Sequence, residues 1–340
     1  MKANVTEKGA ILLGKYVACD AYEKTRPLRV VTHAHGDHMN GLGQSLRNCD
    51  MVVMTPATKD FIDVIKGPRF LSRGNVNAIE YNEPIVYADE RLILHRVDHI
   101  LGAAQVLVED AEGMRILYTG DFRMSNTPVI ESDILVIEAT YGSPWRTRSF
   151  GQEVKQELIS TVEEGLQQGP VYVFGYHGKL QEVMQVLHEA RIEVPFVMPE
   201  RILQISKIHR KHGARIYRPL FSTKQKFQTT LLGDERYVAF HHMNRRNKVG
   251  LGEFRVCVSG WEFNSPCRQT GEKEYVVALS DHSDFKGLLE YVKRSQPKMV
   301  ITDNYRAGDA EGLAIQIRKQ LGIVAKALPI RNTIPTNTAS

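Results

Sequence analysis

Cysteine is scarce in this sequence, and long apolar runs are absent. The 340 residues include only 4 cysteines, and no two of them form a Cys-x-x-Cys pair, so neither a zinc ribbon nor a disulfide framework is indicated. No stretch approaches the roughly 20 apolar residues that a membrane-spanning helix needs, and the N-terminus lacks the pattern of a secretion signal. We therefore expect an intracellular, cytoplasmic protein in a reducing compartment, with no membrane partner.

Proline and glycine are not in excess, and neither an internal repeat nor a low-complexity tract is evident. The composition is typical of a globular protein, with 42% hydrophobic and 24% charged residues. The formal net charge of +5 is modest but uneven, because twelve lysines and arginines between residues 201 and 248 accompany only two acidic residues, Asp234 and Glu235. Such a run is typical of a solvated face, and it also fits a track for a phosphodiester backbone.

Strands dominate both ends of the chain, whereas helices alternate with strands in the middle. Short apolar runs rich in valine predict strands at 28–32, 50–54, 91–94, 104–108, 115–118 and 134–137, with short helices at 42–47 and 57–65. The next segment reads as βα units, with helices at 152–168 and 179–190 and strands at 171–174, 196–198 and 215–217. The last third predicts strands at 254–259, 274–279 and 299–302 and helices at 285–295 and 310–320. The pattern predicts an α/β protein divided into residues 1–148, 149–255 and 256–340.

Four potential metal ligands fall within six residues directly after the first predicted buried strand, in His33-Ala34-His35-Gly36-Asp37-His38. An extended backbone points His33 and His35 the same way, and a following helical turn would let Asp37 and His38 face the same pocket. Imidazoles and carboxylates are the donors that Zn²⁺ takes. Burying four of them is costly unless something coordinates them. A polar surface turn is the alternative interpretation.

This motif resembles the metal signature of the metallo-β-lactamase superfamily, whose fold is an αββα sandwich. The resemblance continues along the chain: Asp20 matches an early aspartate that supports the histidine loop, His99 matches the third ligand motif, and Asp121 matches the aspartate that bridges two ions. It implies two divalent ions, Zn²⁺ first and Mn²⁺ or Mg²⁺ as alternatives. The implied ligands are His33, His35, His99 and Asp121 for one ion, and Asp37, His38 and Asp121 for the other.

Two later segments resemble signatures of the β-CASP nucleases, a branch of that superfamily with a second domain inserted into the core. Glu138 ends a predicted strand before Thr-Tyr-Gly, as in the first signature, and His282 lies in Ser-Asp-His-Ser-Asp, as in the second. The resemblance spans the chain from Asp20 to about Asp303. It is closest to short prokaryotic exonucleases labelled as mRNA 3′-end processing factors and to Artemis-type nucleases. It implies a metallo-β-lactamase core over 1–148 and 256–340, with an α/β β-CASP cap over 149–255.

The third β-CASP signature departs from the pattern. RNA-cutting members often have a histidine after a C-terminal strand, whereas this chain has Asp303 there and no histidine after His282. DNA-directed members also lack that histidine, so the departure favours DNA as the nucleic-acid partner. We hypothesise that the Asp303 carboxylate replaces the imidazole as a metal ligand; a strand-end aspartate that touches no metal is the alternative.

The resemblance also implies roles in phosphodiester hydrolysis. Asp37 and Asp121 would act through the metal ions, and His282 would be the general acid, with Glu138 orienting its ring. The products would carry a 5′-phosphate and a 3′-hydroxyl. Substrate contacts are expected from a glycine turn at the start of the cap helix and from two serines beside His282: Tyr176, His177, Gly178, Lys179, Ser280 and Ser283. Tyr141, Trp145 and Tyr176 could also stack on bases, although we favour core packing for them.

Four functions fit these patterns to different degrees. The first is a 5′→3′ exonuclease on single-stranded DNA that acts in repair, with other repair proteins as partners. The second is an RNA-processing ribonuclease of the same group. A lactonase or thioesterase with the same metal core is disfavoured by the Glu138 and His282 motifs and by the basic segment. A non-catalytic nucleic-acid scaffold is disfavoured because the implied metal ligands are intact.

Overall fold

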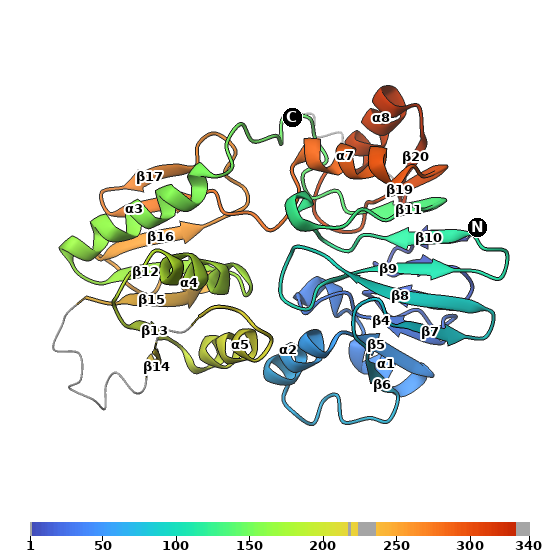
Figure 1. The fold of residues 1–340 in the computed structure, drawn as a ribbon, viewed down its shortest axis with the longest axis horizontal. Coiled ribbons are helices and arrows are strands. Elements are labelled where there is room, and N and C mark those ends of the chain that lie inside the picture. The colour runs from blue at the N-terminus through green and yellow to red at the C-terminus, as the bar shows by residue number, and fades with distance from the viewer. Residues whose placement is uncertain (1, 217–218, 224–235, 331–340) are drawn as a thin grey trace, which may run out of the picture.

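The computed structural model describes residues 2–216, 219–223 and 236–330, which form two lobes (Figure 1). The described residues contain three multi-stranded sheets and seven α-helices, so the predicted α/β class is confirmed. The helices are α1 (Leu42–Asn48), α2 (Pro56–Lys66), α3 (Glu153–Gln168), α4 (Lys179–Glu189), α5 (Glu200–Lys211), α7 (Phe285–Ser295) and α8 (Ala310–Leu321). Within the described ranges, no helix combines the length and the apolar character that crossing a bilayer requires.

The first lobe contains two sheets that pack face to face. The first sheet consists, in spatial order, of β1 (Ala3–Val5), β2 (Ile11–Leu13), β3 (Val17–Cys19), β4 (Leu28–Val30), β5 (Met51–Met54) and β6 (Val76–Ala78). The second consists of β20 (Val324–Leu328), β19 (Met299–Asp303), β11 (Ile134–Ile137), β10 (Arg115–Tyr118), β9 (Ala104–Glu109), β8 (Glu90–Arg96) and β7 (Pro84–Tyr87).

Apolar side chains of both sheets share one buried cluster, to which Val30 and Val53 contribute from the first sheet and Val106 and Val136 from the second. A second cluster joins the outer faces of these sheets to α1, α2, α7 and α8. The central strands are therefore buried on both faces, which explains their continuous apolar sequences. The resulting layers are helix, sheet, sheet and helix.

The second lobe is built on one seven-stranded sheet, covered by α3, α4 and α5 (Figure 1). In spatial order its strands are β14 (Leu220–Ser222), β13 (Phe196–Met198), β15 (Val238–His242), β12 (Val171–Gly175), β16 (Phe254–Val258), β18 (Glu274–Val277) and β17 (Cys267–Gly271). All neighbouring pairs are parallel except β17 with β18. The sheet therefore continues to Val277, past the sequence-based boundary at 255, because β16 and β18 extend it from β12.

Most predicted elements are present, several with the predicted ends. The strands at 115–118, 134–137 and 196–198 and the helix at 285–295 match to the residue. The strand expected at 215–217 is wrong for Arg215 and Ile216, which form no strand, and Tyr217 lies outside the described residues. There the chain turns back onto α5, since the Ala214 amide donates to the His209 carbonyl at 2.9 Å.

Candidate metal centre

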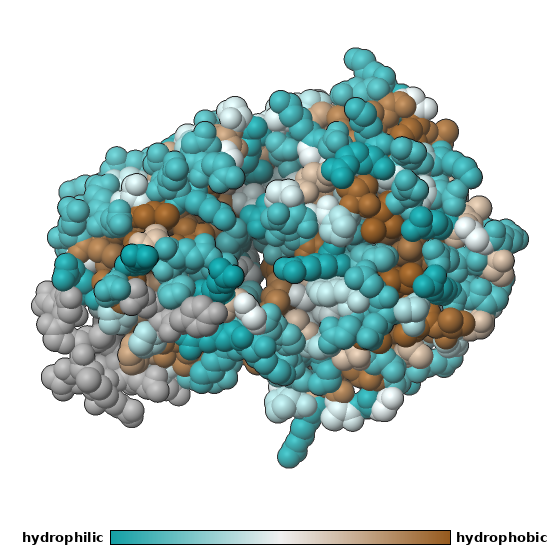
Figure 2. Space-filling view, in the orientation of Figure 1, coloured by the Kyte–Doolittle hydropathy of each residue, from teal (hydrophilic) through white to brown (hydrophobic). Residues whose placement is uncertain are grey.

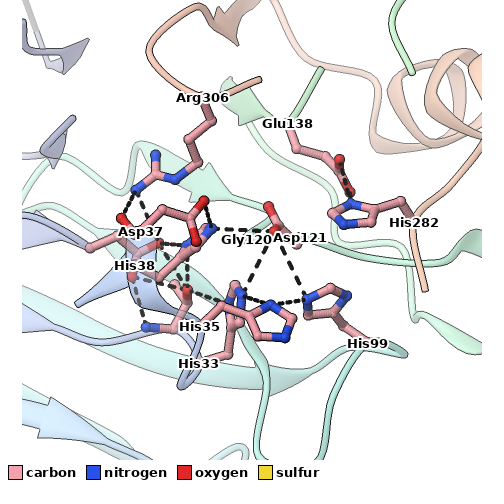
Figure 3. Close-up of polar contacts among 12 residues, drawn as sticks. His33, His35, Asp37, His38, His99, Gly120, Asp121, Glu138, His282 and Arg306 are labelled. Atoms are coloured by element: carbon pink, nitrogen blue, oxygen red, sulfur yellow. Dashed lines mark hydrogen bonds and ion pairs between the residues drawn. The ribbon is translucent and has the colours of Figure 1, made fainter. Parts of the chain in front are cut away.

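The histidine motif lies where β4 ends and the chain enters a short 3-10 helix, Gly36–His38. This turn lets His33 and His35 extend in one direction while Asp37 and His38 approach from the other side (Figure 3). The Asp20 carboxylate holds the motif in place. It accepts a hydrogen bond from the Thr32 amide at 2.9 Å and contacts His38 Nδ1 at 2.7 Å. Asp20 therefore has the supporting position that the resemblance implies.

Three histidines and one aspartate from three separate loops converge beside this turn. The ligand atoms of His33, His35, His99 and Asp121 all lie within 4.8 Å of one another. His35 Nδ1 is 3.1 Å from His33 Nε2 and 3.2 Å from His99 Nε2. His99 comes from the β8–β9 connection and Asp121 from the end of β10. Long-range folding thus assembles the donor set that the sequence implies for the first ion.

The charge states of these groups suit a divalent cation. Burial lowers the pKa of His33 and of His99, and it lowers the pKa of His35 to about 4. These imidazoles are therefore neutral at pH 7 and can donate lone pairs. Burial opposes ionisation of Asp121, but the neighbouring His38 outweighs it and holds the pKa of that carboxyl well below its usual range. Neutral imidazoles around a carboxylate fit a divalent metal ion.

The second implied ligand set is less uniform. His38 Nε2 lies 3.2 Å from Asp121 Oδ2 and 3.5 Å from Asp37 Oδ2. Burial and the Arg306 guanidinium oppose protonation of His38, but Asp121 and Asp20 outweigh them and raise its pKa to about 10. A metal ion at this position would have to displace that proton, so binding there would release protons. The assignment of Asp37 and His38 as ligands stays a prediction.

Asp303 lies at the end of β19 but points to a partner other than the three-histidine group. Its Oδ2 accepts from Arg306 Nη1 at 2.6 Å and its Oδ1 accepts from the Tyr305 amide at 2.9 Å. Arg306 Nη2 in turn approaches the Asp37 carbonyl oxygen at 3.5 Å (Figure 3). Among the described residues, Asp303 joins none of the groups whose ligand atoms could share an ion. The structure thus gives no support to Asp303 as a ligand, and it places Arg306, which the sequence analysis missed, beside Asp37.

The buried Glu138 and the half-buried His282 form a pair next to the cluster. His282 Nδ1 lies 3.0 Å from Glu138 Oε2, and Glu138 Oε1 also accepts from the Phe122 amide at 2.9 Å. The His282 ring is 5.0 Å from the His99 ring and its Nε2 is 3.9 Å from Asp281 Oδ1, so the ring lies beside the metal group. Burial disfavours the imidazolium, but the attraction of Glu138 outweighs it and raises the pKa of His282 to about 9. His282 is therefore protonated at pH 7 and can act as an acid.

The expected substrate contacts at the cap turn differ in their environment. Tyr176 is 51% exposed, and the His177 carbonyl lies 3.4 Å from His35 Nε2. A side chain on Gly178 would clash with Ile100, which shows how closely this turn approaches the core. Lys179 is buried and bound to Asp281 at 2.6 Å, so its ammonium group is already neutralised. These contacts stay predictions, and the structure does not favour Lys179 among them.

Two serines and two aromatics complete the predicted set. The Ser280 hydroxyl accepts from the His282 amide at 3.1 Å, and the Ser283 hydroxyl donates to the Phe122 carbonyl at 3.0 Å. Both hydroxyls thus shape the His282 loop. Tyr141 is buried as favoured from the sequence, but Trp145 is 72% exposed and, like Tyr176, is not a core residue.

The lobes meet beside the metal group. Arg123 connects them, because its guanidinium binds Asp98 of the core at 3.0 Å and Glu182 of α4 at 3.0 Å. A cavity of about 770 Å³ lies at this junction and is lined by His99 and Arg123 on one side and by Gln181 on the other. Figure 2 shows a mostly hydrophilic surface that is hollowed between the lobes. Arg123 and Asp281 were missed from the sequence because their partners are distant along the chain.

The fold and this cluster define an α/β protein with a candidate divalent-metal centre at the junction of two lobes. No family model matches the chain. A solved structure of a protein of unknown function from Enterococcus faecalis covers 91% of this chain and 81% of its own at a TM-score of 0.61 and 13% identity. That likeness shows the fold alone.

Several curated proteins are similar to this chain in sequence. An uncharacterised protein in the lig 3′ region of Acidianus ambivalens is 38% identical over 137 residues, which are 40% of this chain and 98% of the relative. A probable DNA ligase of Opitutus terrae is 25% identical over 80% of this chain but only 26% of its own length. An RNase J-like protein of Methanocaldococcus jannaschii is 27% identical over 54% of this chain and 50% of its own. With the ordered motifs, these similarities fit the β-CASP nuclease group of the metallo-β-lactamase superfamily.

Proposed function

We propose that this chain is a metal-dependent nuclease that hydrolyses phosphodiester bonds of a nucleic acid. The observation that carries the proposal is the His282–Glu138 pair, which lies 5.0 Å, ring to ring, from His99 of the metal group. A metal cluster alone is compatible with several hydrolases. A protonated histidine beside it supplies the proton that a leaving alkoxide requires.

Each residue of the site would have its own role in phosphodiester hydrolysis. His33, His35, His99 and Asp121 would hold the first ion, and Asp37 and His38 would contribute to a second. Bound divalent ions would supply a hydroxide at neutral pH and would stabilise charge on the phosphate. The Glu138 carboxylate would accept a hydrogen bond from His282 Nδ1–H and so direct Nε2 towards the substrate. As the hydroxide oxygen bonded to phosphorus, the bond to the 3′ oxygen would break and His282 would protonate that oxygen, leaving a 5′-phosphate and a 3′-hydroxyl.

The two lobes would have different parts in this chemistry. We propose that the two facing sheets with α1, α2, α7 and α8 are the αββα metallo-β-lactamase core, and that the third sheet is the β-CASP cap. The cap would then run from about residue 149 to Val277, because β16, β17 and β18 pair within its sheet. The metal group and the His282–Glu138 pair lie on the core side of the junction, facing the cap.

For the substrate, we propose single-stranded DNA digested from its 5′ end, with RNA as the second candidate. The missing histidine at Asp303 and the ligase relative favour DNA, and the RNase J-like relative favours RNA. The chain spans only a quarter to a half of the length of these two relatives.

A panel of end-labelled single-stranded DNA and RNA, each with a 5′-phosphate or a 5′-hydroxyl, separates these candidates. Each would be incubated with Zn²⁺, Mn²⁺ or Mg²⁺. Stepwise release of nucleotides from phosphorylated DNA would support the first candidate, and preferential cleavage of RNA would replace it with the second. Hydrolysis of a lactone or thioester without cleavage of either polynucleotide would reject the nuclease proposal.

A further inference from the structure

An exposed aromatic surface lies close to the His282–Glu138 pair. Trp261, in the loop after β16, is 52% exposed. Its ring is 5.1 Å from the buried Tyr141 ring, which is itself 5.8 Å from the His282 ring. Exposing an indole is unfavourable unless something covers it. Trp261 therefore presents a large apolar face one ring away from the proposed general acid.

Arginines interleave with this surface. The Arg146 guanidinium lies 5.3 Å from the Trp261 ring centre and 5.1 Å from that of Phe263. No carboxylate of the described chain forms an ion pair with Arg146, so its charge is available for an anion. Aromatic rings that alternate with unpaired guanidinium groups are the arrangement that binds single-stranded nucleic acids, with the rings stacking on bases and the cations contacting phosphates.

The surface is also held rigidly. Arg148 donates to the Gly260 and Glu262 carbonyls, so the linker after β11 fixes the Trp261 loop. A side chain on Gly260 would clash with the Tyr141 hydroxyl, which shows that the loop packs closely on Tyr141. A ring that is already in position loses less conformational entropy when it binds. The loop thus has the rigidity of a binding platform.

We infer that Trp261 and Arg146 form a stacking subsite for an unpaired nucleobase and its phosphate, next to the bond that is cleaved. The inference rests on the proposed nuclease function and adds to it the two residues that would recognise an unpaired base beside the cleaved bond. A base paired within a duplex has no free face for Trp261, whereas any unpaired base has one, so the subsite would select strandedness and tolerate different sequences.

The two tryptophans of the chain make the subsite directly observable. In full-length protein carrying Asp121→Ala to prevent cleavage, Trp145→Phe leaves Trp261 as the single indole, and Trp261→Phe leaves Trp145. Titration with single-stranded oligonucleotide is expected to quench the Trp261 emission, whereas a blunt duplex of the same sequence quenches it much less. Trp261→Ala is expected to weaken binding of a labelled oligonucleotide, measured by anisotropy, by roughly tenfold or more.

Controls separate this inference from the proposed function. Trp145→Ala removes an indole that is more exposed than Trp261, and a matched thermal midpoint shows that each variant is folded. If the oligonucleotide binds Trp261→Ala with unchanged affinity and does not alter the Trp261 emission of the Trp145→Phe variant, the subsite is rejected while the nuclease proposal stands. If wild-type protein neither binds nor cleaves any oligonucleotide, the proposed function fails and the subsite fails with it.

Discussion

At the scale of single residues, neighbours set opposite charge states on histidines that lie close together. Burial lowers the pKa of His35 to about 4, whereas the carboxylates around His38 and His282 outweigh burial and raise their pKa values to about 10 and about 9. The first histidine is therefore suited to a metal and the last to proton donation. Residue type alone does not distinguish these roles, since all three are histidines of one cluster.

The raised pKa of His282 predicts the alkaline limb of the kcat–pH profile. If protonated His282 is the acid, kcat should fall as the pH rises through about 9. Glu138→Gln removes the charge that raises this pKa, so the limb should move towards the ordinary histidine value of about 6.5. A kcat–pH profile with saturating oligonucleotide measures this, and an unshifted limb would show that another group is the acid.

The same pair makes the stability of the protein depend on pH. Because the pKa of His282 is raised in the fold, the pair stabilises the protein fully below about pH 6.5, and this stabilisation is lost as the pH rises through about 9.

Replacing Asp303 tests whether its carboxylate binds a metal ion or only pairs with Arg306. The structure predicts that Asp303→Ala retains the metal content of the wild type, because its carboxylate is bound to Arg306. The variant should instead lose roughly 3–5 kcal/mol of unfolding free energy, since the buried guanidinium is left without its partner. Elemental analysis and urea unfolding give the two quantities. Loss of one metal equivalent in folded protein would restore the ligand hypothesis.

At the scale of elements, the sequence predicts best those strands that local residues define. The apolar runs at β10 and β11 end at glycine, aspartate or glutamate, and their bounds are confirmed to the residue. The three-residue strands β1 and β2 are too short for a pattern to show, and basic residues dilute the apolar spacing of α5. The membership of β16 and β18 in the third sheet depends on pairing with β12, which local patterns do not encode.

In the candidate site, too, the sequence predicts what local residues define and misses what depends on distant partners. The metal donors could be predicted because four of them lie in one short motif and the others follow in a known order. Arg306, Arg123 and Asp281 could not, since their importance comes from partners that only the fold brings near. Arg306 did have one signal, its position three residues after Asp303, because a strand-end aspartate commonly pairs with a nearby cation.

The turn that presents Asp121 gives an element-scale prediction. Gly120 has φ +58°, and an added Cβ would lie 2.9 Å from the Ala104 carbonyl oxygen. Gly120→Ala should therefore destabilise the fold by roughly 1–3 kcal/mol beyond the backbone cost and lower metal affinity by about tenfold, by displacing Asp121. Gly113→Ala is the matched control, because Gly113 also has positive φ, +78°, with no atom within 4 Å. Equal thermal midpoints and equal metal affinities in the two variants would refute the role of this turn.

At the scale of the whole molecule, the chemistry depends on how two lobes meet. The first lobe supplies the metal donors and the His282–Glu138 pair, while the turn at His177 of the second lobe approaches His35. Arg123 joins Asp98 of the first lobe to Glu182 of the second and also donates to the Ser280 carbonyl at 3.1 Å, beside the His282 loop. One guanidinium thus couples cap position to the proposed acid.

Removing that guanidinium should loosen the junction without emptying the metal group. Arg123→Met is expected to cost about 1.5–3 kcal/mol of junction stability and to increase amide hydrogen exchange in α4, while metal content stays at the wild-type level. Hydrogen-exchange mass spectrometry with elemental analysis tests this. Unchanged exchange in α4 would show that other contacts, such as Lys211 with Asp60 at 2.7 Å, hold the lobes together.

The most direct test of the central claim is metal reconstitution of nuclease activity in one preparation. Chelated wild-type protein and Asp121→Ala would each be titrated with Zn²⁺ while bound metal and cleavage of a 5′-phosphorylated, single-stranded oligonucleotide are followed together. The account predicts that cleavage by the wild type rises with bound metal, whereas Asp121→Ala stays inactive. Full metal loading of folded wild-type protein without cleavage of DNA or RNA, repeated with Mn²⁺ and Mg²⁺, would contradict it.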